Sequence, residues 1–272
     1  MLDSLGDRMK ADFENRFRTY LPRRTYTLIR VDGKAFHTYT KGLIRPFDDA
    51  LMDDMDATAK YLCKNIMGAK CAFVQSDEIT IVITDFEKTT SQAWFDNNLQ
   101  KMCSVSAAMA TKAFNEARFK RYLREKFKGG ISTITDKWFE QLNKQKWAEF
   151  DSRVWQVPQR TEVFNTLVWR QQDATRNSIQ SVAQTLYRQK ELEKKSSKEQ
   201  QDLIFAKGIN WNEYAPKYKR GRMIVREVYF KMPETVGDEK IEPALRTRWI
   251  SQEPPIFSQD HSYLDKLIPK NE

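Results

Sequence analysis

Two short acidic clusters follow apolar stretches that have the composition of β-strands. Asp32 and Gly33 end the first stretch, TYTLIRVDG, and Asp77 and Glu78 lie between the apolar runs CAFVQ and ITIVIT. A carboxylate at a buried strand end is costly unless a positive group compensates it, and a divalent cation is the usual compensator. Either cluster alone is more typical of an ordinary turn than of a metal site. Together, on strands that could be neighbours, they indicate a metal site.

The remaining residue types limit which metal could bind. The chain has only two histidines, His37 and His261, and its three cysteines form no CxxC pair, so imidazole and thiolate centres are disfavoured. Oxygen ligands point to magnesium or manganese. If the first strand pairs with the later hairpin in an antiparallel sheet, Asp32 and Asp77 come within reach of one ion. This arrangement is typical of the palm of two-metal nucleotidyltransferases, in which one ion helps to activate the attacking hydroxyl and the other holds the triphosphate.

Composition narrows the class of protein. The 272 residues, 40% of them hydrophobic, can bury a substantial core. No apolar run approaches the roughly 18 residues that cross a bilayer, and the first residues lack an apolar signal core, so we expect a cytoplasmic protein with no membrane partner. The sequence has neither a GxxxxGK[ST] nor a GxGxxG motif, which leaves out the P-loop and Rossmann phosphate cradles.

The charge of the chain favours a polyanionic partner. Lys and Arg number 46 against 37 Asp and Glu, a formal net charge of +9. The stretch 118–128 holds six cations and one anion, and the stretch 160–227 combines a further cationic surplus with tryptophans and tyrosines. Cations attract phosphates and exposed aromatic rings stack on unpaired bases, as nucleic-acid binding requires. A solvated helix face with ordinary core aromatics would give the same composition.

Hydrophobic periodicity predicts the elements that position the acidic clusters. The first half of the chain follows the order strand, helix, hairpin, helix, and the second half is a strand, a long helix and a strand with an irregular, proline-containing tail. Within the long helix, Arg170, Asp173 and Arg176 could form one polar stripe. The segment 34–40 could continue the first strand. We expect strands at 25–31, 150–158 and 220–231, a hairpin at 71–84, and helices at 47–68, 90–118 and 161–192.

Several motifs resemble one known family. The strings RVDGKAFH, RPFD, QSDEIT, VSAAMAT, FDSRV, WRQQDATRNSI and KGINWN, followed by KRG, occur in this order across residues 30 to 221. This order is similar to that of the tRNA-His guanylyltransferase superfamily, whose members add nucleotides to the 5′ end of tRNA in the 3′-to-5′ direction. The resemblance implies a homotetramer, two Mg²⁺ ions that Mn²⁺ can replace, and activation of the 5′ end by ATP or GTP before a nucleoside triphosphate attacks it.

The same resemblance implies a fold. We expect an α+β protein with a polymerase-palm-like, ferredoxin-like antiparallel sheet, packed helices, and a helical and β C-terminal extension. Residues 1–135 would form the palm-like catalytic domain. Residues 136–272 would pack on the palm and contact tRNA.

The resemblance also assigns residues to roles. The metal ligands fall on Asp32, the carbonyl of Gly33 and Asp77, and Glu78 is a further catalytic candidate. Nucleotide binding falls on a second set that includes the same turn: Asp32, Gly33, Lys34, Ala35, Phe36, His37, Arg45, Ser76, Asp77 and Lys101. Contacts to tRNA or triphosphate fall on Arg30, Arg153, Asp173, Lys198 and Asn210.

One departure favours a subfamily. Eukaryotic members carry His-Ile-Asn-Asn after the WRQ motif, whereas this chain has Thr175, Arg176, Asn177 and Ser178. The chain therefore resembles the Thg1-like proteins, which repair 5′-truncated tRNAs by template-dependent addition. Base pairing would then supply specificity, and shape and phosphate contacts would suffice for the protein. Three alternatives stay open: a strict tRNA-His guanylyltransferase that adds one G at position −1, a nucleotide cyclase, and a non-catalytic tRNA-binding module.

Overall fold

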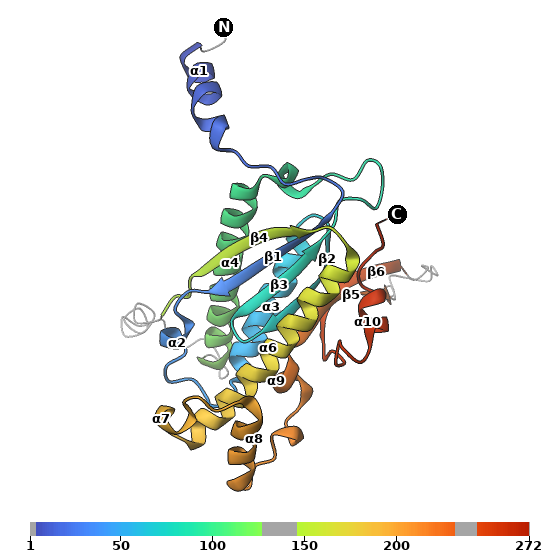
Figure 1. Ribbon diagram of the computed structural model, residues 1–272. Helices are drawn as coiled ribbons and strands as arrows, with labels where there is room; N and C mark the ends of the chain where they lie inside the picture. Colours follow the sequence, from blue (N-terminus) through green and yellow to red (C-terminus); the bar gives the residue numbers. More distant parts are fainter. Residues whose placement is uncertain (1–3, 127–145, 232–243, 272) are drawn as a thin grey trace, which may run out of the picture.

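A six-stranded antiparallel sheet organises the molecule (Figure 1). The computed structural model describes residues 4–126, 146–231 and 244–271. The strand order is β4-β1-β3-β2-β5-β6. The bounds are β1 Tyr26–Gly33, β2 Ala69–Gln75, β3 Glu78–Ile83, β4 Phe150–Val157, β5 Arg222–Lys231 and β6 Ala244–Gln252.

The first four strands and two helices form a ferredoxin-like unit. Helices α3 (Asp49–Asn65) and α4 (Leu99–Lys126) occur in the chain order β1-α3-β2-β3-α4-β4. With the strand order 4-1-3-2, this is the split β-α-β arrangement that the sequence predicts. Helix α3 begins after an N-cap, because the Asp48 side chain accepts a hydrogen bond of 2.8 Å from the Leu51 amide.

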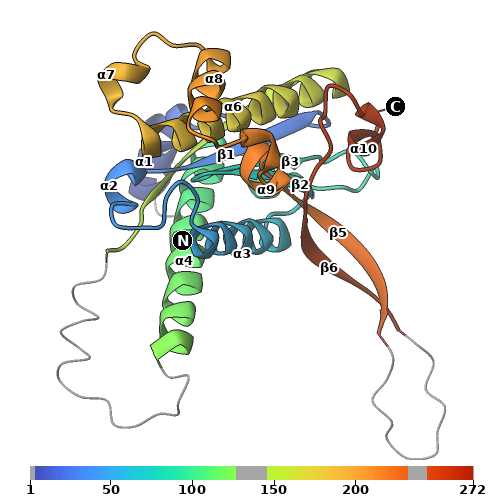
Figure 2. The same ribbon diagram turned by 90° about the horizontal axis from the view of Figure 1, so that it is seen from below.

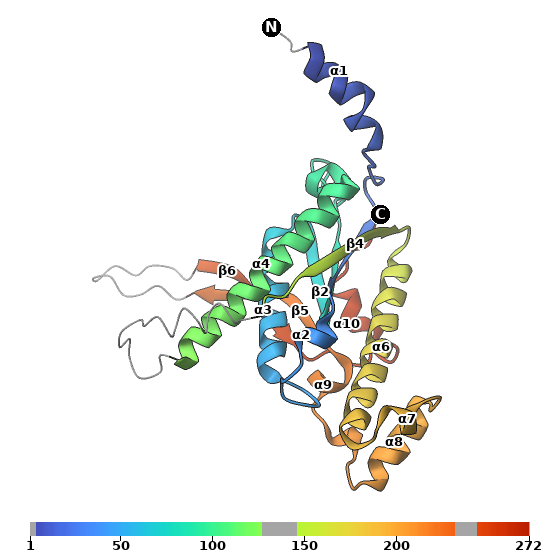
Figure 3. The same cartoon turned by 90° about the vertical axis from the view of Figure 1, so that its left-hand side faces the viewer.

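Helices cover both faces of the sheet (Figure 3). Successive strand residues point to opposite faces, so Ile29 and Val31 pack in the core under α3 and α4. Leu28 packs in the second core, with Val163 and Leu167 of α6 (Arg160–Leu186). Asp32 is an even-numbered residue of β1, as Leu28 is, and its side chain therefore lies on the α6 face.

A third cluster lies beyond the C-terminal half of α6 (Figure 2). It joins α6 to three short elements, α7 (Gln189–Leu192), α8 (Ser197–Ala206) and the 3-10 helix η3 (Trp211–Glu213), and α9 (Pro216–Arg220) then leads into β5. The C-terminal α10 (His261–Asp265) packs in the core on the α6 face. At the other end of the chain, α1 (Ser4–Asp12) projects from the body, followed by the 3-10 helix η1 (Glu14–Phe17).

Three sequence predictions of local structure were wrong. Residues 36–39 form the short helix α2 (Phe36–Tyr39), not more strand, because the buried Phe36 turns the chain back onto the core. The predicted helix 90–118 begins only at Leu99, after the 3-10 helix η2 (Trp94–Asn97) with left-handed residues. The proline-containing tail includes a regular strand, β6, paired with β5 over nine residues.

The sheet crosses the predicted domain boundary. That boundary, 135/136, lies outside the described residues, and β4 from the predicted C-terminal part pairs with β1 along its whole length. The division into two parts stays a prediction. In the described ranges, no helix has the length and apolar character needed to cross a membrane.

Candidate active site

Strand pairing brings the two acidic clusters together. Asp32 is the register partner of Glu78 on β3 and of Asp151 on β4. The turn between β2 and β3 is only two residues long, and its second residue, Asp77, accepts a hydrogen bond of 3.1 Å from the Gly33 amide through its carbonyl. Residues 45 positions apart in sequence thus share one corner of the sheet.

The carboxylates at this corner are poorly compensated. Burial is the largest cause of the raised pKa of Asp32, and the nearby Asp151 adds to it. Burial also raises the pKa of Asp77, to which the charge of Asp32 contributes. In the described part of the chain, the ion pairs include neither Asp32 nor Asp77. The folded chain therefore holds two carboxylates that a cation would stabilise.

These residues fit magnesium. Mg²⁺ commonly takes one or two protein carboxylates and completes its shell with water and substrate phosphates. Within the described residues, no group of three or more His, Cys, Asp or Glu side chains is arranged to hold a metal alone. Two partly buried carboxylates that form no ion pair among the described residues, with the Gly33 carbonyl beside them, match a site that is completed by its substrate.

The raised pKa values predict that the site destabilises the metal-free chain. A carboxyl whose pKa is raised on folding favours the folded state at low pH, and this contribution is lost as pH rises from about 3.8, its ordinary value, through the folded-state pKa. Asp77→Asn should therefore raise the thermal unfolding midpoint at neutral pH in EDTA. The gain should vanish below the ordinary pKa, and a midpoint unchanged or lowered at neutral pH would contradict it.

Gly33 is required by the packing of its neighbour. A Cβ at this position would lie 2.2 Å from Cδ2 of the Phe36 ring, which is itself buried against Phe114 and Phe150. The aromatic cluster leaves the ring little room to move. The absence of a side chain therefore lets the chain turn directly from β1 into α2 beside Asp77.

Gly33→Ala should destabilise the fold by about 2 kcal/mol, since it overpacks this cluster. Urea unfolding at equilibrium measures the loss. Lys34→Ala is the control, because the Lys34 side chain is exposed and pairs only with the exposed Glu149. Equal stability of the two variants would show that the Phe36 ring moves aside freely.

Glu78 is held differently from the two aspartates. Its Oε2 lies 3.4 Å from Nη1 of Arg170 and 4.0 Å from Nε of Arg30. Arg170 also pairs with Asp173, which pairs with Arg176 at 2.6 Å. The predicted polar stripe on α6 is thus confirmed, and it anchors Glu78 and the end of β3 to that helix.

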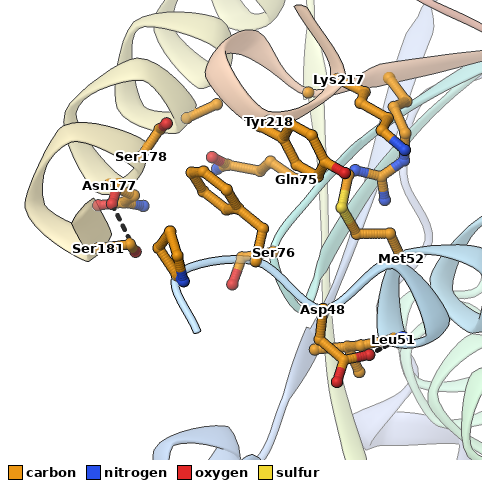
Figure 4. A pocket seen from close by; sticks show the side chains of 15 residues that line it. Asp48, Leu51, Met52, Gln75, Ser76, Asn177, Ser178, Ser181, Lys217 and Tyr218 are labelled. Carbon is orange, nitrogen blue, oxygen red and sulfur yellow. Dashed lines mark hydrogen bonds between the residues drawn. The ribbon is translucent and has the colours of Figure 1, made fainter. Parts of the chain in front are cut away.

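A pocket opens beside the hairpin turn (Figure 4). This hairpin pocket has a volume of about 130 Å³. It lies between Gln75 at the end of β2, the turn residue Ser76, the start of α3, the α6 residues Asn177 and Ser178, and α9. One wall is aromatic, since Phe47 stacks on Tyr218 with ring centroids 4.7 Å apart.

The chemistry of the hairpin pocket suits a nucleoside. It offers aromatic surface, amide and hydroxyl groups, and it adjoins Ser76 and hence Asp77. Asn177 and Ser178 belong to the segment in which this chain departs from the eukaryotic motif. The hairpin pocket and the two carboxylates are therefore neighbours at one corner of the sheet.

Comparison with known proteins decides the family. Residues 6–158, more than half of the chain, match the family described as tRNAHis guanylyltransferase. The chain belongs to this family.

Relatives of the guanylyltransferase family match nearly the whole chain. A bacterial tRNA(His) guanylyltransferase (Thg1)-like protein in complex with ATP shares 42% identity, with a TM-score of 0.79, over 98% of this chain and 99% of that one. A structure with the same description in complex with GTP shares 42% identity with this chain, with a TM-score of 0.75. The match covers 97% of this chain and 99% of that one. The tRNA(His) guanylyltransferase of Saccharomyces cerevisiae is 26% identical over 80% of this chain and 90% of its own length.

These matches confirm the predicted family and the palm-like fold. Members of the guanylyltransferase family are nucleotidyltransferases that act on tRNA, so the family assignment favours an enzyme of this class. It disfavours the nucleotide cyclase and the non-catalytic module that the residues alone left open.

The other residues assigned by the family resemblance are dispersed. Arg30 and Asp173 lie in the network around Glu78, and Lys34, Ala35 and His37 are exposed beside the site. Arg153 lies next to Asp151 on β4, 3.9 Å from its carboxylate. A second group has no described contact with the carboxylates: Arg45, Lys101 at the start of α4, Lys198 in α8, and Asn210, which caps η3.

Sequence reasoning missed several residues at this corner. Asp151 comes there only through the pairing of β4 with β1, and its signal was the FDSRV motif. Arg170 was recognised as part of a stripe but not as the partner of Glu78. Lys217 and Tyr218 lie in the cationic and aromatic stretch 160–227, but nothing in the sequence placed them at the hairpin pocket.

Proposed function

We propose that this protein is a template-dependent 3′-to-5′ nucleotidyltransferase that repairs the 5′ end of tRNA. The observation that supports this most is the pair of partly buried carboxylates of Asp32 and Asp77, which form no ion pair among the described residues and lie beside the hairpin pocket. The bacterial Thg1-like relatives are described in complex with ATP and GTP, which supports both nucleotides as ligands of this chain.

The proposed reaction has two steps. The 5′-phosphate of the tRNA attacks the α-phosphorus of ATP or GTP, and pyrophosphate leaves. The 3′-hydroxyl of an incoming nucleoside triphosphate then attacks the activated 5′-phosphate, and the nucleoside monophosphate leaves. A new phosphodiester bond joins the added nucleotide to the tRNA.

Asp32, Asp77 and the Gly33 carbonyl would hold the two Mg²⁺ ions. Bound there, the ions would lower the pKa of the attacking hydroxyl and neutralise charge on the leaving phosphates. The chain's own contribution is to fix these oxygens: the hydrogen bond from Gly33 to the Asp77 carbonyl ties the turn to β1, and the ion pair from Glu78 to Arg170 ties β3 to α6.

The hairpin pocket would orient the nucleoside. Phe47 and Tyr218 offer a stacked aromatic wall, and Tyr218 donates a hydrogen bond of 2.7 Å to Asp49, which fixes its ring. With the base held there, the triphosphate could extend past Ser76 toward Asp77. The family resemblance further supports a homotetramer, which sedimentation analysis of the purified chain would test.

A strict tRNA-His guanylyltransferase is the second candidate, supported by the similarity to the yeast enzyme of that name. Labelled GTP incorporation separates the two. We expect addition to several 5′-truncated tRNAs whatever their anticodon, at rates above that for intact tRNA-His. Addition confined to tRNAs with the histidine anticodon would favour the strict enzyme and contradict templated repair.

A further inference from the structure

A second pocket lies on the α4 side of the molecule, away from the hairpin pocket. This α4 pocket, of about 360 Å³, is enclosed by α2, α4, the loop 40–50 and the residues that precede β4. Cations and aromatic rings are prominent in its lining, notably Tyr39, Lys41, Arg118, Arg121, Lys146 and Trp147. Asp48 lines both pockets, so they are separated only by the loop that leads into α3.

The described residues that line the α4 pocket carry more positive than negative charge. Arg118 and Arg121 share a single carboxylate, that of the buried Asp54, so two guanidinium groups face one negative charge. Lys41 and Lys146 add two exposed ammonium groups. The Asp48 carboxylate accepts hydrogen bonds from the Leu51 and Ile44 amides and is engaged in capping α3. An anion in this pocket would complete the charge balance.

Two polar atoms in the wall of the α4 pocket have no hydrogen-bond partner among the described residues. They are the Tyr39 hydroxyl and Nη1 of Arg121, both shielded from solvent at the level of the atom. Burial raises the pKa of Tyr39, so its hydroxyl stays protonated and able to donate. An unused buried donor costs free energy, and both atoms belong to side chains that line this pocket.

The position of Lys146 and Trp147 is fixed by side-chain hydrogen bonds. Asn115 of α4 accepts from the Ala148 amide and donates to the Ala148 carbonyl, each at 2.9 Å. This pair of bonds holds the preceding two residues against α4. The Trp147 ring is 57% exposed although it is large and apolar, so it offers a flat surface at the rim of the pocket.

We propose that the α4 pocket binds a phosphate of the RNA substrate, with Trp147 stacking on an adjoining base. The inference rests on the proposed function, since it takes the substrate to be RNA. Fixed guanidinium groups, flexible lysines and an exposed indole are the combination that binds a nucleotide unit of an RNA strand through its charge and its ring. The pocket thus gives the RNA a second contact, separate from the carboxylates.

The test uses Lys41→Ala/Lys146→Ala, with Lys112→Ala/Lys120→Ala as the matched control. Both double variants remove two exposed lysine charges, and the control lysines lie on α4 but outside the pocket. Binding of a 5′-truncated tRNA is measured by fluorescence polarisation at about 0.1 M salt and over a salt series. Stabilisation of each variant by GTP is measured separately by thermal shift.

We expect the pocket variant to bind the tRNA about tenfold more weakly than the control, with the salt slope reduced by about 0.8, as the loss of one neutralised phosphate predicts. Trp147→Ala should weaken binding about tenfold with the salt slope unchanged, since it removes stacking and not charge. The thermal shift with GTP should stay the same in every variant.

Three results would overturn the inference. Affinity of the pocket variant within twofold of the control would show that the pocket does not bind the RNA. A smaller GTP shift would assign the pocket to free nucleotides. If the unsubstituted chain bound no tRNA, both the inference and the proposed function would be wrong. If the pocket variant bound the tRNA as tightly as the control, only the inference would be wrong.

Discussion

Asp77→Asn should lower the rate of nucleotide addition to a 5′-truncated tRNA by about a thousandfold or more. The substitution keeps the shape of the side chain but removes the charge that would hold a divalent ion. Loss of a metal that stabilises transferring phosphates costs several kcal/mol in the transition state. Single-turnover incorporation of labelled GTP measures the effect, and tRNA affinity measured in parallel should change little.

Asp151→Asn is the matched control for Asp77→Asn. Asp151 is also a carboxylate at this corner and the register partner of Asp32, but its side chain is 55% exposed and lies 3.9 Å from Arg153. Its loss should reduce the rate by tenfold at most. The rate of Glu78→Gln should fall between those of the two aspartate variants, because Glu78 already forms an ion pair with Arg170. Equal losses for Asp77→Asn and Asp151→Asn would mean that the corner acts only through its overall charge.

Arg170→Gln should destabilise the folded chain by about 3 kcal/mol. The Arg170 side chain is 5% exposed and pairs with both Glu78 and Asp173. Its removal therefore takes one cationic partner from each of these two shielded carboxylates. Breaking a buried ion pair from one side costs roughly 3–5 kcal/mol. Equilibrium urea unfolding monitored by circular dichroism gives the free energy of unfolding.

Arg176→Gln provides the comparison for Arg170→Gln. Arg176 pairs with the same Asp173 but is 59% exposed, so its loss should cost about 0.5 kcal/mol or less. The double variant Arg170→Gln/Glu78→Gln should recover part of the loss, since the unpaired charge of Glu78 is then gone. Similar costs for the two arginine substitutions would show that Arg170 is not the centre of this network.

The sequence allowed the palm-like core to be predicted, since its signals are local. Segments of about twenty residues or fewer are enough to recognise the apolar runs of β1, β2 and β3 and the capped, periodic helix α3. Strand β6 could not be recognised from its own sequence, because most of its side chains are exposed and pairing with β5 stabilises it. Helix α2 was missed because packing of Phe36, not local propensity, ends the strand at Gly33.

The candidate site was also predictable in part from the sequence. The two aspartates followed from residue type and strand order, and the structure brings them to one corner. Asp151 and Arg170 could not be placed from sequence, since they reach the corner through β4 and α6, more than 70 residues along the chain. The basic stretch 118–128 was interpreted as favouring a polyanionic partner, but the sequence did not show that Arg118 and Arg121 pair with Asp54 beside the α4 pocket, and Lys128 lies outside the described residues.

The most direct test of templated addition at the Asp32 and Asp77 site changes the template. A tRNA lacking its 5′ nucleotide is prepared with either C or A opposite the missing position, and incorporation of labelled GTP and UTP is compared for the unsubstituted chain and Asp77→Asn. The proposed function predicts G opposite C and U opposite A, with both reactions lost in Asp77→Asn. Addition of G whatever the opposite base, or undiminished addition by Asp77→Asn, would contradict it.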